Sequence, residues 1–295
     1  MTDIAFIGIG AMGEPMAANL LKKGFAVTVV QHTRAEPAAR LKALGAKIAA
    51  TPAAAAQGCE VVILSLPTSR EVEAVIEGKN GLAAQPAAGT VIVDCSTSNP
   101  PSTRRLSALL REKGIGLVAA GMTRGVAGAK QGTLAFFIGG EQADIDRAKP
   151  VLQAMGDTFI QFRSAADAHA AKVISNVLSY ATVALVNEAL MLGAESGVDL
   201  KTLHEALTQG APSKALEAFG PRLIAGDYDP PRVTVEHVCA DMILAQEMAS
   251  SGLAPVFLLG AAQKVYRLIQ SRGHAGRDLS IIAELWRAAT PGGKA

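Results

Sequence analysis

A glycine-rich segment near the start of the chain has the residue types and spacing that bind a pyrophosphate. The segment, Gly8-Ile9-Gly10-Ala11-Met12-Gly13, follows an apolar run at residues 4–7 and precedes a helical stretch at residues 15–23. In this setting Gly8 permits a tight turn, Gly10 lets the pyrophosphate approach the backbone, and Gly13 allows close helix packing. Amide groups at the helix start would face the phosphates. We therefore predict a dinucleotide site made by Gly8, Gly10, Ala11, Met12 and Gly13. The alternative is a glycine turn in an α/β domain that binds no ligand.

The residues after the second predicted strand bear on the choice between NAD and NADP. That strand, at residues 26–30, is followed by Gln31-His32-Thr33-Arg34. A carboxylate here would accept a hydrogen bond from the ribose 2′-hydroxyl of NAD, whereas a basic group would bind the 2′-phosphate of NADP. No carboxylate stands at the strand end, and Thr33 and Arg34 could bind a phosphate with His32 nearby. We expect NADP to be preferred over NAD. The alternative for Arg34 is an ordinary solvent-exposed loop charge.

The glycine segment belongs to a region in which short β-branched runs alternate with alanine-rich helical stretches. The runs lie at residues 4–7, 26–30, 61–66, 91–93, 115–118 and 134–138. Glycines at turn positions separate helix from strand, where a helix end needs a positive φ; they are Gly24, Gly45, Gly89 and Gly114. This alternation predicts an α/β fold, a doubly wound Rossmann domain with a parallel sheet.

The strand pattern disappears after residue 167. Residues 169–196 contain no proline, and no glycine before Gly193, and their apolar residues recur at helical spacing, which predicts one long helix. Further helices are predicted between breaks at residues 210–212, 226–231, 252–255 and 273–276. We therefore expect two domains, an NAD(P)-binding Rossmann domain over residues 1–165 and an all-helical domain over residues 166–295, with the long helix between them.

Composition excludes several classes of partner. The 295 residues are 49% hydrophobic and 18% charged with a formal net charge of +2, so no single-sign field draws the chain to nucleic acid or to an anionic membrane. The apolar start lacks the basic flank of a signal peptide and is too short to span a membrane. Cys59, Cys95 and Cys239 fit neither a disulfide framework nor a metal site, and the histidines lack metal-ligand spacing. We expect a cytoplasmic protein that binds a small molecule and no metal, with Cys59 and Cys95 buried as small apolar residues.

The glycine segment and four later segments resemble one family of oxidoreductases. Residues 7–20, Ile-Gly-Ile-Gly-Ala-Met-Gly-Glu-Pro-Met-Ala-Ala-Asn-Leu, resemble the opening of the β-hydroxyacid dehydrogenases, which include 3-hydroxyisobutyrate dehydrogenase. The resemblance continues at Asp94-Cys95-Ser96-Thr97, at residues 125–134, at residues 172–176 and at residues 273–280. It spans almost the whole chain and implies an NAD(P)-dependent dehydrogenase or reductase that acts on CH–OH groups.

The resemblance also implies roles for individual residues. Leu66 and Pro67 on one segment, and Ser96 and Thr97 on another, would line the nicotinamide side of the site. The long helix would carry the catalytic residue, Lys172, which gives a proton to the carbonyl oxygen and takes it back in the oxidative direction. Partial burial lowers the pKa of a lysine, which would let it exchange a proton near neutral pH. The alternative is an ordinary surface lysine.

Asn176 follows Lys172 by four residues, so both side chains project from one face of the predicted helix. Its amide could orient the lysine or the substrate. We therefore count Asn176 among the substrate-binding residues.

The chain departs from the family pattern at the substrate loop. The family reads roughly Asp-Ala-Pro-Val-Ser-Gly-Gly, whereas this chain reads Ala119-Ala120-Gly121-Met122-Thr123-Arg124-Gly125. Thr123 keeps a hydroxyl where the family has its serine, and Arg124 introduces a guanidinium. We hypothesise that Thr123, Arg124 and Gly125 bind the substrate, with Arg124 as a bidentate clamp on a carboxylate. The alternative is that Arg124 points outward into solvent.

Two further departures lie in the second half of the chain. Ser175 replaces the first asparagine of the Lys-x-x-Asn-Asn pattern, and Ala240 stands where the family commonly has a lysine before the aspartate, here Asp241. By the resemblance, Asp241 belongs with the cofactor-binding residues. With Arg124 gained and that lysine lost, one positive charge has moved, which favours a specialised small anionic substrate over loss of activity.

The leading interpretation is an enzyme that interconverts a small β-hydroxyacid, or a related hydroxyacid, with its aldehyde or semialdehyde, using NADP or NAD. One alternative is a dinucleotide-binding module without turnover. Another is a reductase of a non-carboxylate carbonyl or an imine, although Lys172 argues against imine reduction because imine reductases of this fold usually lack it. The long alanine-rich helix and the apolar residues 256–262 favour a homodimer or homotetramer.

Overall fold

The computed structural model describes residues 2–32, 34–79, 81–84, 89–252 and 255–287. The chain divides into two compact units, Met1–Lys172 (unit 1) and Val173–Ala295 (unit 2). This division falls inside the long helix, whereas the sequence interpretation places the domain boundary between residues 165 and 166, at the start of that helix. Each unit has a hydrophobic core of its own.

Unit 1 contains an eight-stranded sheet with the order β3-β2-β1-β4-β5-β6-β7-β8. Its strands are β1 (Asp3–Ile7), β2 (Ala26–Val30), β3 (Lys47–Ala49), β4 (Val61–Leu64), β5 (Val91–Asp94), β6 (Gly116–Thr123), β7 (Leu134–Gly139) and β8 (Gly156–Phe162). All neighbours are parallel except β6 and β7. The order from β3 to β6 is that of dinucleotide-binding Rossmann domains, which confirms the predicted fold class. The antiparallel step at β7 was not predicted.

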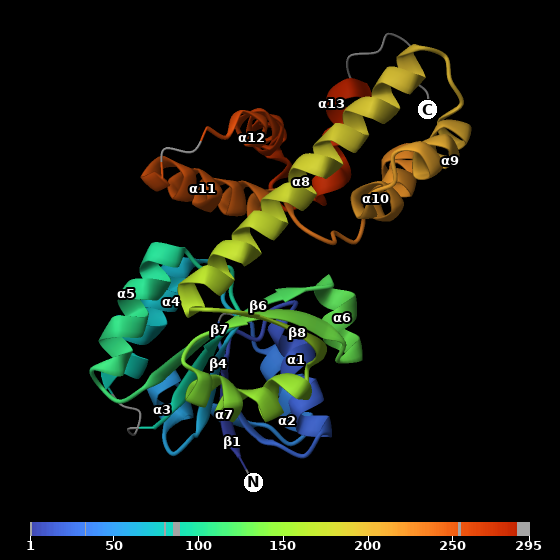
Figure 1. Cartoon of the computed structure of the whole chain (residues 1–295). Coiled ribbons are helices and arrows are strands. Elements are labelled where there is room, and N and C mark those ends of the chain that lie inside the picture. The colour runs from blue at the N-terminus through green and yellow to red at the C-terminus, as the bar shows by residue number, and fades with distance from the viewer. Residues whose placement is uncertain (1, 33, 80, 85–88, 253–254, 288–295) are drawn as a thin grey trace. The chain divides into compact units, whose positions relative to one another are not determined.

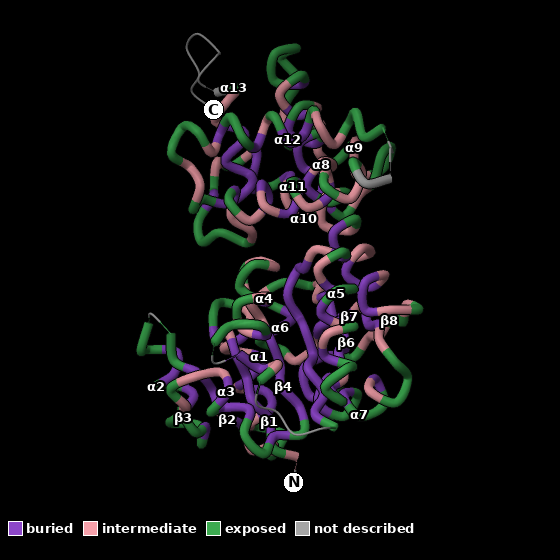
Figure 2. Tube along the Cα trace, turned by 90° about the vertical axis from the view of Figure 1, so that its left-hand side faces the viewer, coloured by how far each residue is buried: buried purple, intermediate pink, exposed green. Residues whose placement is uncertain are grey.

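Helices cover both faces of this sheet because successive strand residues point to opposite sides. Ile4 and Phe6 of β1 share one buried cluster with residues of α1, α2 and α7, whereas Ala5 and Ile7 share another with residues of α3, α4 and α5. Figure 1 shows these helices around the sheet. The helices are α1 (Gly13–Lys22), α2 (Glu36–Ala43), α3 (Pro52–Ala56), α4 (Ser69–Glu77), α5 (Pro100–Arg111), α6 (Gly125–Gln131) and α7 (Gln142–Gln153), with a 3-10 turn, η1 (Leu82–Ala84). The central strands are therefore buried on both faces (Figure 2).

Strand β6 extends further than the sequence predicts. We expected a strand at residues 115–118 followed by a loop, but antiparallel pairing with β7 continues the strand to Thr123, with Gly121 opposite Phe137 and Thr123 opposite Ala135. The chain then turns at Arg124, whose φ is +76°, and enters α6. Most of the expected substrate loop is therefore held by the sheet.

Unit 2 is helical, and α8 (Ala165–Glu195) enters it from unit 1 as one continuous helix of 31 residues. The other helices are α9 (Leu200–Gly210), α10 (Lys214–Ala225), α11 (Val235–Gly252), α12 (Phe257–Ile269), η2 (Gln270–His274), η3 (Leu279–Ala283) and α13 (Glu284–Arg287). The core combines Tyr180 and Val183 of α8 with Met242 of α11 and Tyr266 of α12. These observations confirm the predicted long helix and helical second half. Cys59 and Cys95 are buried, as predicted, and Cys239 is buried as well; all three are free.

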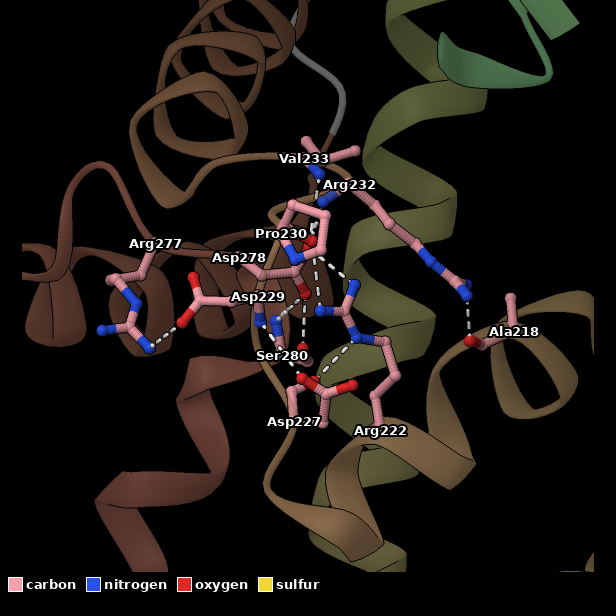
Figure 3. Close-up of polar contacts among 10 residues, drawn as sticks. All are labelled: Ala218, Arg222, Asp227, Asp229, Pro230, Arg232, Val233, Arg277, Asp278 and Ser280. Atoms are coloured by element: carbon pink, nitrogen blue, oxygen red, sulfur yellow. Dashed lines mark hydrogen bonds and ion pairs between the residues drawn. The ribbon is translucent and has the colours of Figure 1, made fainter. Parts of the chain in front are cut away.

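A buried carboxylate holds the connection between α10 and α11 (Figure 3). Asp278 has no exposed surface, accepts a hydrogen bond from the backbone N–H of Arg232 at 2.6 Å, and forms an ion pair with Arg222 at 3.6 Å. Arg222 also donates to the carbonyl oxygens of Asp227 and Pro230. Because a buried charge is costly unless it is paired and hydrogen-bonded, this set of contacts fixes the loop against η3.

Helix α8 is long and apolar enough, by length and composition alone, to cross a membrane. One such helix is weak evidence for a membrane span, because the core helix of a soluble protein passes the same test. Tyr180, Val183 and Leu190 of α8 lie in the core of unit 2, and only 33% of the residues in its most apolar window are buried. The helix therefore has one face in the core and another that is exposed.

Candidate active site

The glycine turn lies between β1 and α1, as predicted. A Cβ atom on Gly8 would lie 2.1 Å from the carbonyl oxygen of Ser65, and one on Gly13 would lie 1.9 Å from that of Gly8. A Cβ atom on Gly10 would meet no protein atom within 4 Å. Packing therefore requires glycine at Gly8 and Gly13, whereas Gly10 and Ala11 are exposed, on the side where this fold binds a pyrophosphate.

The residues that would distinguish NADP from NAD lie at the exposed end of β2. Gln31, His32 and Arg34 are exposed, and Thr33 lies outside the described residues. Hydrogen bonds from Arg40 lower the pKa of Glu14 in α1; burial opposes this, and the charges of Arg40 and Arg34 add to the lowering. The Arg40 guanidinium contacts the Glu14 carboxylate at 2.5 and 2.9 Å. Arg40, which the sequence interpretation did not include, therefore adds a second guanidinium near the glycine turn.

The two segments predicted to flank the nicotinamide lie together at the carboxyl ends of β4 and β5. The backbone N–H of Leu66 donates to the hydroxyl of Ser96 at 2.9 Å, and the N–H of Ser96 donates to Asp94 at 2.9 Å. Ser96 and Thr97 are buried, whereas Pro67, beside Leu66, is exposed. The carboxyl ends of parallel strands are where this fold binds its cofactors, so the contact supports the predicted grouping.

Lys172 lies on α8 against strand β6. A Cβ atom on Gly121 would lie 2.8 Å from the Cβ of Lys172 and 2.9 Å from its Cγ, so the lysine stem crosses the strand where there is no side chain. Thr123 ends β6 two residues further on, and both Lys172 and Thr123 are partly buried. The structure therefore brings the predicted proton-transfer residue close to the predicted substrate segment.

Arg124 and Gly125 form the exposed turn after β6. The Arg124 guanidinium donates to the Thr133 carbonyl at 2.6 Å, to Asp157 at 2.6 Å and to the Thr158 hydroxyl at 2.8 Å. A clamp on a substrate carboxylate would require the guanidinium to leave these partners. The exposed ion pair with Asp157 contributes only about 0–1 kcal/mol, but release would also break the hydrogen bonds to Thr133 and Thr158, and the clamp stays a prediction.

A second polar cluster lies in unit 2 around the buried carboxylate of Asp241. Asn176 donates to Asp241 at 2.6 Å and the Tyr180 hydroxyl donates at 3.1 Å, while His237 lies 3.5 Å from the same carboxylate. Burial, together with the charge of Asp241, raises the pKa of Tyr180 well above its usual value. Asp241 therefore contacts the predicted substrate residue Asn176. The cofactor contact that we assigned to it remains a prediction.

Other features of the described residues lie apart from these segments. A cavity of about 280 Å³ borders the amino end of β6 and is lined by Arg104, Arg111, Asp144 and Arg163 among others, but by none of the predicted site residues. The described part of the chain has no group of three or more His, Cys, Asp or Glu residues arranged to hold a metal ion. One buried histidine, His169, lies three residues before Lys172 and was not among the predicted site residues.

Comparison with protein families identifies the group to which this arrangement belongs. The family described as the NAD binding domain of 6-phosphogluconate dehydrogenase matches residues 3–164. The family described as NAD-binding of NADP-dependent 3-hydroxyisobutyrate dehydrogenase matches residues 166–286. The chain belongs to the β-hydroxyacid dehydrogenase family. It is a dehydrogenase that uses NAD or NADP, and the resemblance noted in the sequence is confirmed.

Several members of this dehydrogenase family match the chain from end to end. The NAD-dependent L-serine dehydrogenase of Pseudomonas aeruginosa is 34% identical, over 97% of this chain and 98% of its own length. The 3-hydroxyisobutyrate dehydrogenase of the same organism is 35% identical, over 97% and 99%. The structure of 3-hydroxyisobutyrate dehydrogenase from Mycobacterium tuberculosis, solved with L-serine, is 29% identical with a TM-score of 0.88, over 97% and 99%.

Proposed function

We propose that this dehydrogenase interconverts a small β-hydroxyacid, or a related hydroxyacid, with its aldehyde or semialdehyde, and that Lys172 is the general acid and base. The observation that carries the proposal is the packing of the Lys172 stem over Gly121, beside the strand end that holds Thr123. L-serine and 3-hydroxyisobutyrate, named for the similar proteins, share a hydroxyl group on the carbon β to a carboxylate. A substrate of that chemistry would present a carboxylate and a CH–OH group to the site.

The residues of the proposed site have the following roles in the reaction. NAD⁺ or NADP⁺, when bound at the glycine turn, would supply the acceptor for the hydride of the carbinol carbon. Lys172, as the neutral amine, takes the proton from the substrate hydroxyl oxygen and, as the ammonium, returns it in the reductive direction. Thr123, Gly125 and Asn176 orient the substrate, and Arg124 joins them if it leaves Asp157. The glycine turn holds the pyrophosphate, and the segments that contain Leu66 and Ser96 flank the nicotinamide.

A preference for NADP belongs to the same proposal. Arg34 provides positive charge near the end of β2 and the start of α1, where a 2′-phosphate would bind, and Arg40 lies beside it in an ion pair with Glu14. The preference is measured as the ratio of kcat/KM for the two oxidised cofactors with one hydroxyacid.

Self-association and a cytoplasmic location are also proposals. Four apolar residues of α8 are 56–70% exposed: Ile174, Leu178, Leu185 and Leu192. The three leucines are spaced by seven residues and therefore form a stripe along one side of the helix. A contiguous exposed apolar surface of this kind is typical of an interface, and a second copy of the chain, in a homodimer or homotetramer, would cover it.

The role of Lys172 is tested by comparing wild type with Lys172→Ala and with Lys149→Ala, an exposed lysine of α7 as the matched control. Reduced cofactor is followed by absorbance with L-serine, 3-hydroxyisobutyrate and an alcohol of similar size without a carboxylate. We expect Lys172→Ala to lower kcat about 10²–10⁴-fold while the Kd of the cofactor stays within about threefold, because a proton-transfer group is removed and the nucleotide contacts remain.

The control Lys149→Ala should behave as wild type, and the alcohol without a carboxylate should be a poor substrate. A Lys172→Ala enzyme that keeps the wild-type kcat would overturn the assigned role. An enzyme that prefers the alcohol would overturn the substrate class.

A further inference from the structure

His169 lies completely buried on α8 and contacts two other elements of unit 1. Its Nδ1 is 2.7 Å from the hydroxyl oxygen of Thr103 on α5. Its Nε2 is 3.4 Å from the carbonyl oxygen of Asp94, at the end of β5, and 3.7 Å from the carboxylate of that residue. Burial lowers the pKa of His169, although the negative charge of Asp94 opposes this. Because both neighbours of Nε2 are oxygens of Asp94, a neutral ring would donate from Nε2. Nδ1 then accepts from the Thr103 hydroxyl, whose single proton also faces the carbonyl oxygen of Asn99 at 3.1 Å.

Asp94 connects this histidine to the predicted nicotinamide segments. Its carboxylate also accepts hydrogen bonds from the backbone N–H of Ser96 and from the hydroxyl of Ser98 at 2.7 Å. Ser96 in turn accepts from the N–H of Leu66. One hydrogen-bonded network therefore joins the ends of β4 and β5, the start of α5 and the first turns of α8.

The network enters α8 one helical turn before Lys172. Residues three apart in a helix are neighbours on one face, and the helix between them is rigid. A contact that fixes the position of His169 therefore also fixes the position from which the Lys172 side chain extends over Gly121. An apolar side chain would fill the buried position of His169 without the desolvation cost of a polar ring, but it would make no directional contact with Asp94.

We propose that His169 is a positioning residue that holds Lys172 in register with the nicotinamide-binding segment through Asp94. The proposal rests on the proposed role of Lys172 in proton transfer. The ring itself takes no part in the chemistry, because it is buried and its two nitrogens are engaged by Thr103 and Asp94.

Three substitutions separate the contacts of the ring. His169→Gln can place an amide nitrogen near the position of Nε2, His169→Asn can place one near Nδ1, and His169→Leu has neither. We expect His169→Leu and His169→Asn to lower kcat about 10–100-fold, because displacement of a catalytic group by about 1 Å costs up to about 10²-fold. His169→Gln should stay within about threefold of wild type. The Kd of the cofactor and the number of cofactor sites per chain should not change.

A kinetic isotope effect separates positioning from a structural role. With substrate deuterated at the carbinol carbon, misplacement of Lys172 slows the chemical step, so the isotope effect on kcat should rise in His169→Leu and return towards the wild-type value in His169→Gln. A merely structural role would lower kcat in proportion to the number of cofactor sites, with an unchanged isotope effect and no rescue by glutamine. That result would overturn the proposal.

The results for His169 and Lys172 together distinguish the positioning role from the proposed function. If His169→Leu keeps the wild-type kcat while Lys172→Ala has lost it, the positioning role is wrong and the proposed function stands. If Lys172→Ala keeps full activity, both are wrong. If His169→Leu fails to fold, His169→Asn and His169→Gln carry the test, because only the glutamine can keep the contact with Asp94. An equal kcat per cofactor site in these two variants would overturn the proposal.

Discussion

The glycines of the turn after β1 have different surroundings, although they belong to one pattern. Gly13 is closed in by the carbonyl oxygen of Gly8 and by the ring of Phe6, whereas Gly10 has open space around its Cα. Gly13 is therefore needed for packing within the protein, whereas Gly10 leaves space for the cofactor to approach the backbone. Replacement by alanine should therefore affect mainly cofactor binding at Gly10 and mainly stability at Gly13.

We predict that Gly10→Ala keeps the stability of the wild type within about 0.5 kcal/mol but raises the Kd of the cofactor about tenfold or more, because the methyl group occupies the space of the pyrophosphate. Gly13→Ala should lose about 1–3 kcal/mol or more of unfolding free energy, because its Cβ would overlap backbone. Urea unfolding and cofactor titration measure the two quantities. A Gly10→Ala protein that binds the cofactor as wild type does would place the pyrophosphate elsewhere.

At the residue scale, the sequence located the glycine turn, because the conformation of a turn depends on near neighbours. The glycine turn needs only the strand before it and the helix after it. The partners of Arg124 could not be predicted, since Asp157 and Thr158 lie more than 30 residues away and are brought to it by β8. His169 was missed for the same reason, because its partners Asp94 and Thr103 are 75 and 66 residues distant.

At the scale of elements, strand β6 and helix α8 depend on one close approach. Gly121 is buried in the strand, and the stem of Lys172 passes over it. A side chain at residue 121 would therefore collide with helix α8.

We expect Gly121→Ala to lower kcat about tenfold or more, because the new methyl group would lie 2.8 Å from the Cβ of Lys172 and shift the amine. Cofactor affinity should stay within about threefold, since the glycine turn is untouched. Steady-state kinetics and cofactor titration provide the test, with Gly210→Ala as control, because a Cβ there meets no atom within 4 Å. An unchanged kcat in Gly121→Ala would mean that the helix accommodates the methyl group without moving the lysine.

Strands β3 and β8 were not predicted because both lie at edges of the sheet and have weak apolar patterns. Strand β3 has only three residues and lies at the sheet edge, where Lys47 and Ile48 are exposed. Strand β8 lies at the opposite edge and mixes polar with apolar residues, such as Asp157 and Gln161. Central strands, buried on both faces, give continuous apolar runs and were predicted, whereas edge strands give weaker patterns.

At the scale of the whole molecule, the exposed stripe on α8 bears on self-association. We predict that the wild type is a dimer or a larger oligomer and that Leu185→Lys shifts it towards the monomer, because a charge would replace an apolar side chain in the proposed interface. Leu44→Lys, at an exposed apolar residue next to α2, is the matched control and should not change the mass. Light scattering coupled to size-exclusion chromatography gives the mass. A monomeric wild type would contradict the proposal.

The sequence alone was enough to predict the Rossmann order of elements, the glycine turn and the helical second half, because these follow from local periodicity and from glycines whose conformation depends on adjacent residues. The folded structure brings distant residues together. It paired Arg124 with Asp157, laid Lys172 over Gly121, joined Asn176 to Asp241 and buried His169 against Asp94. Such contacts depend on strand order and helix docking, which bring together residues far apart in the chain, and no local pattern records them.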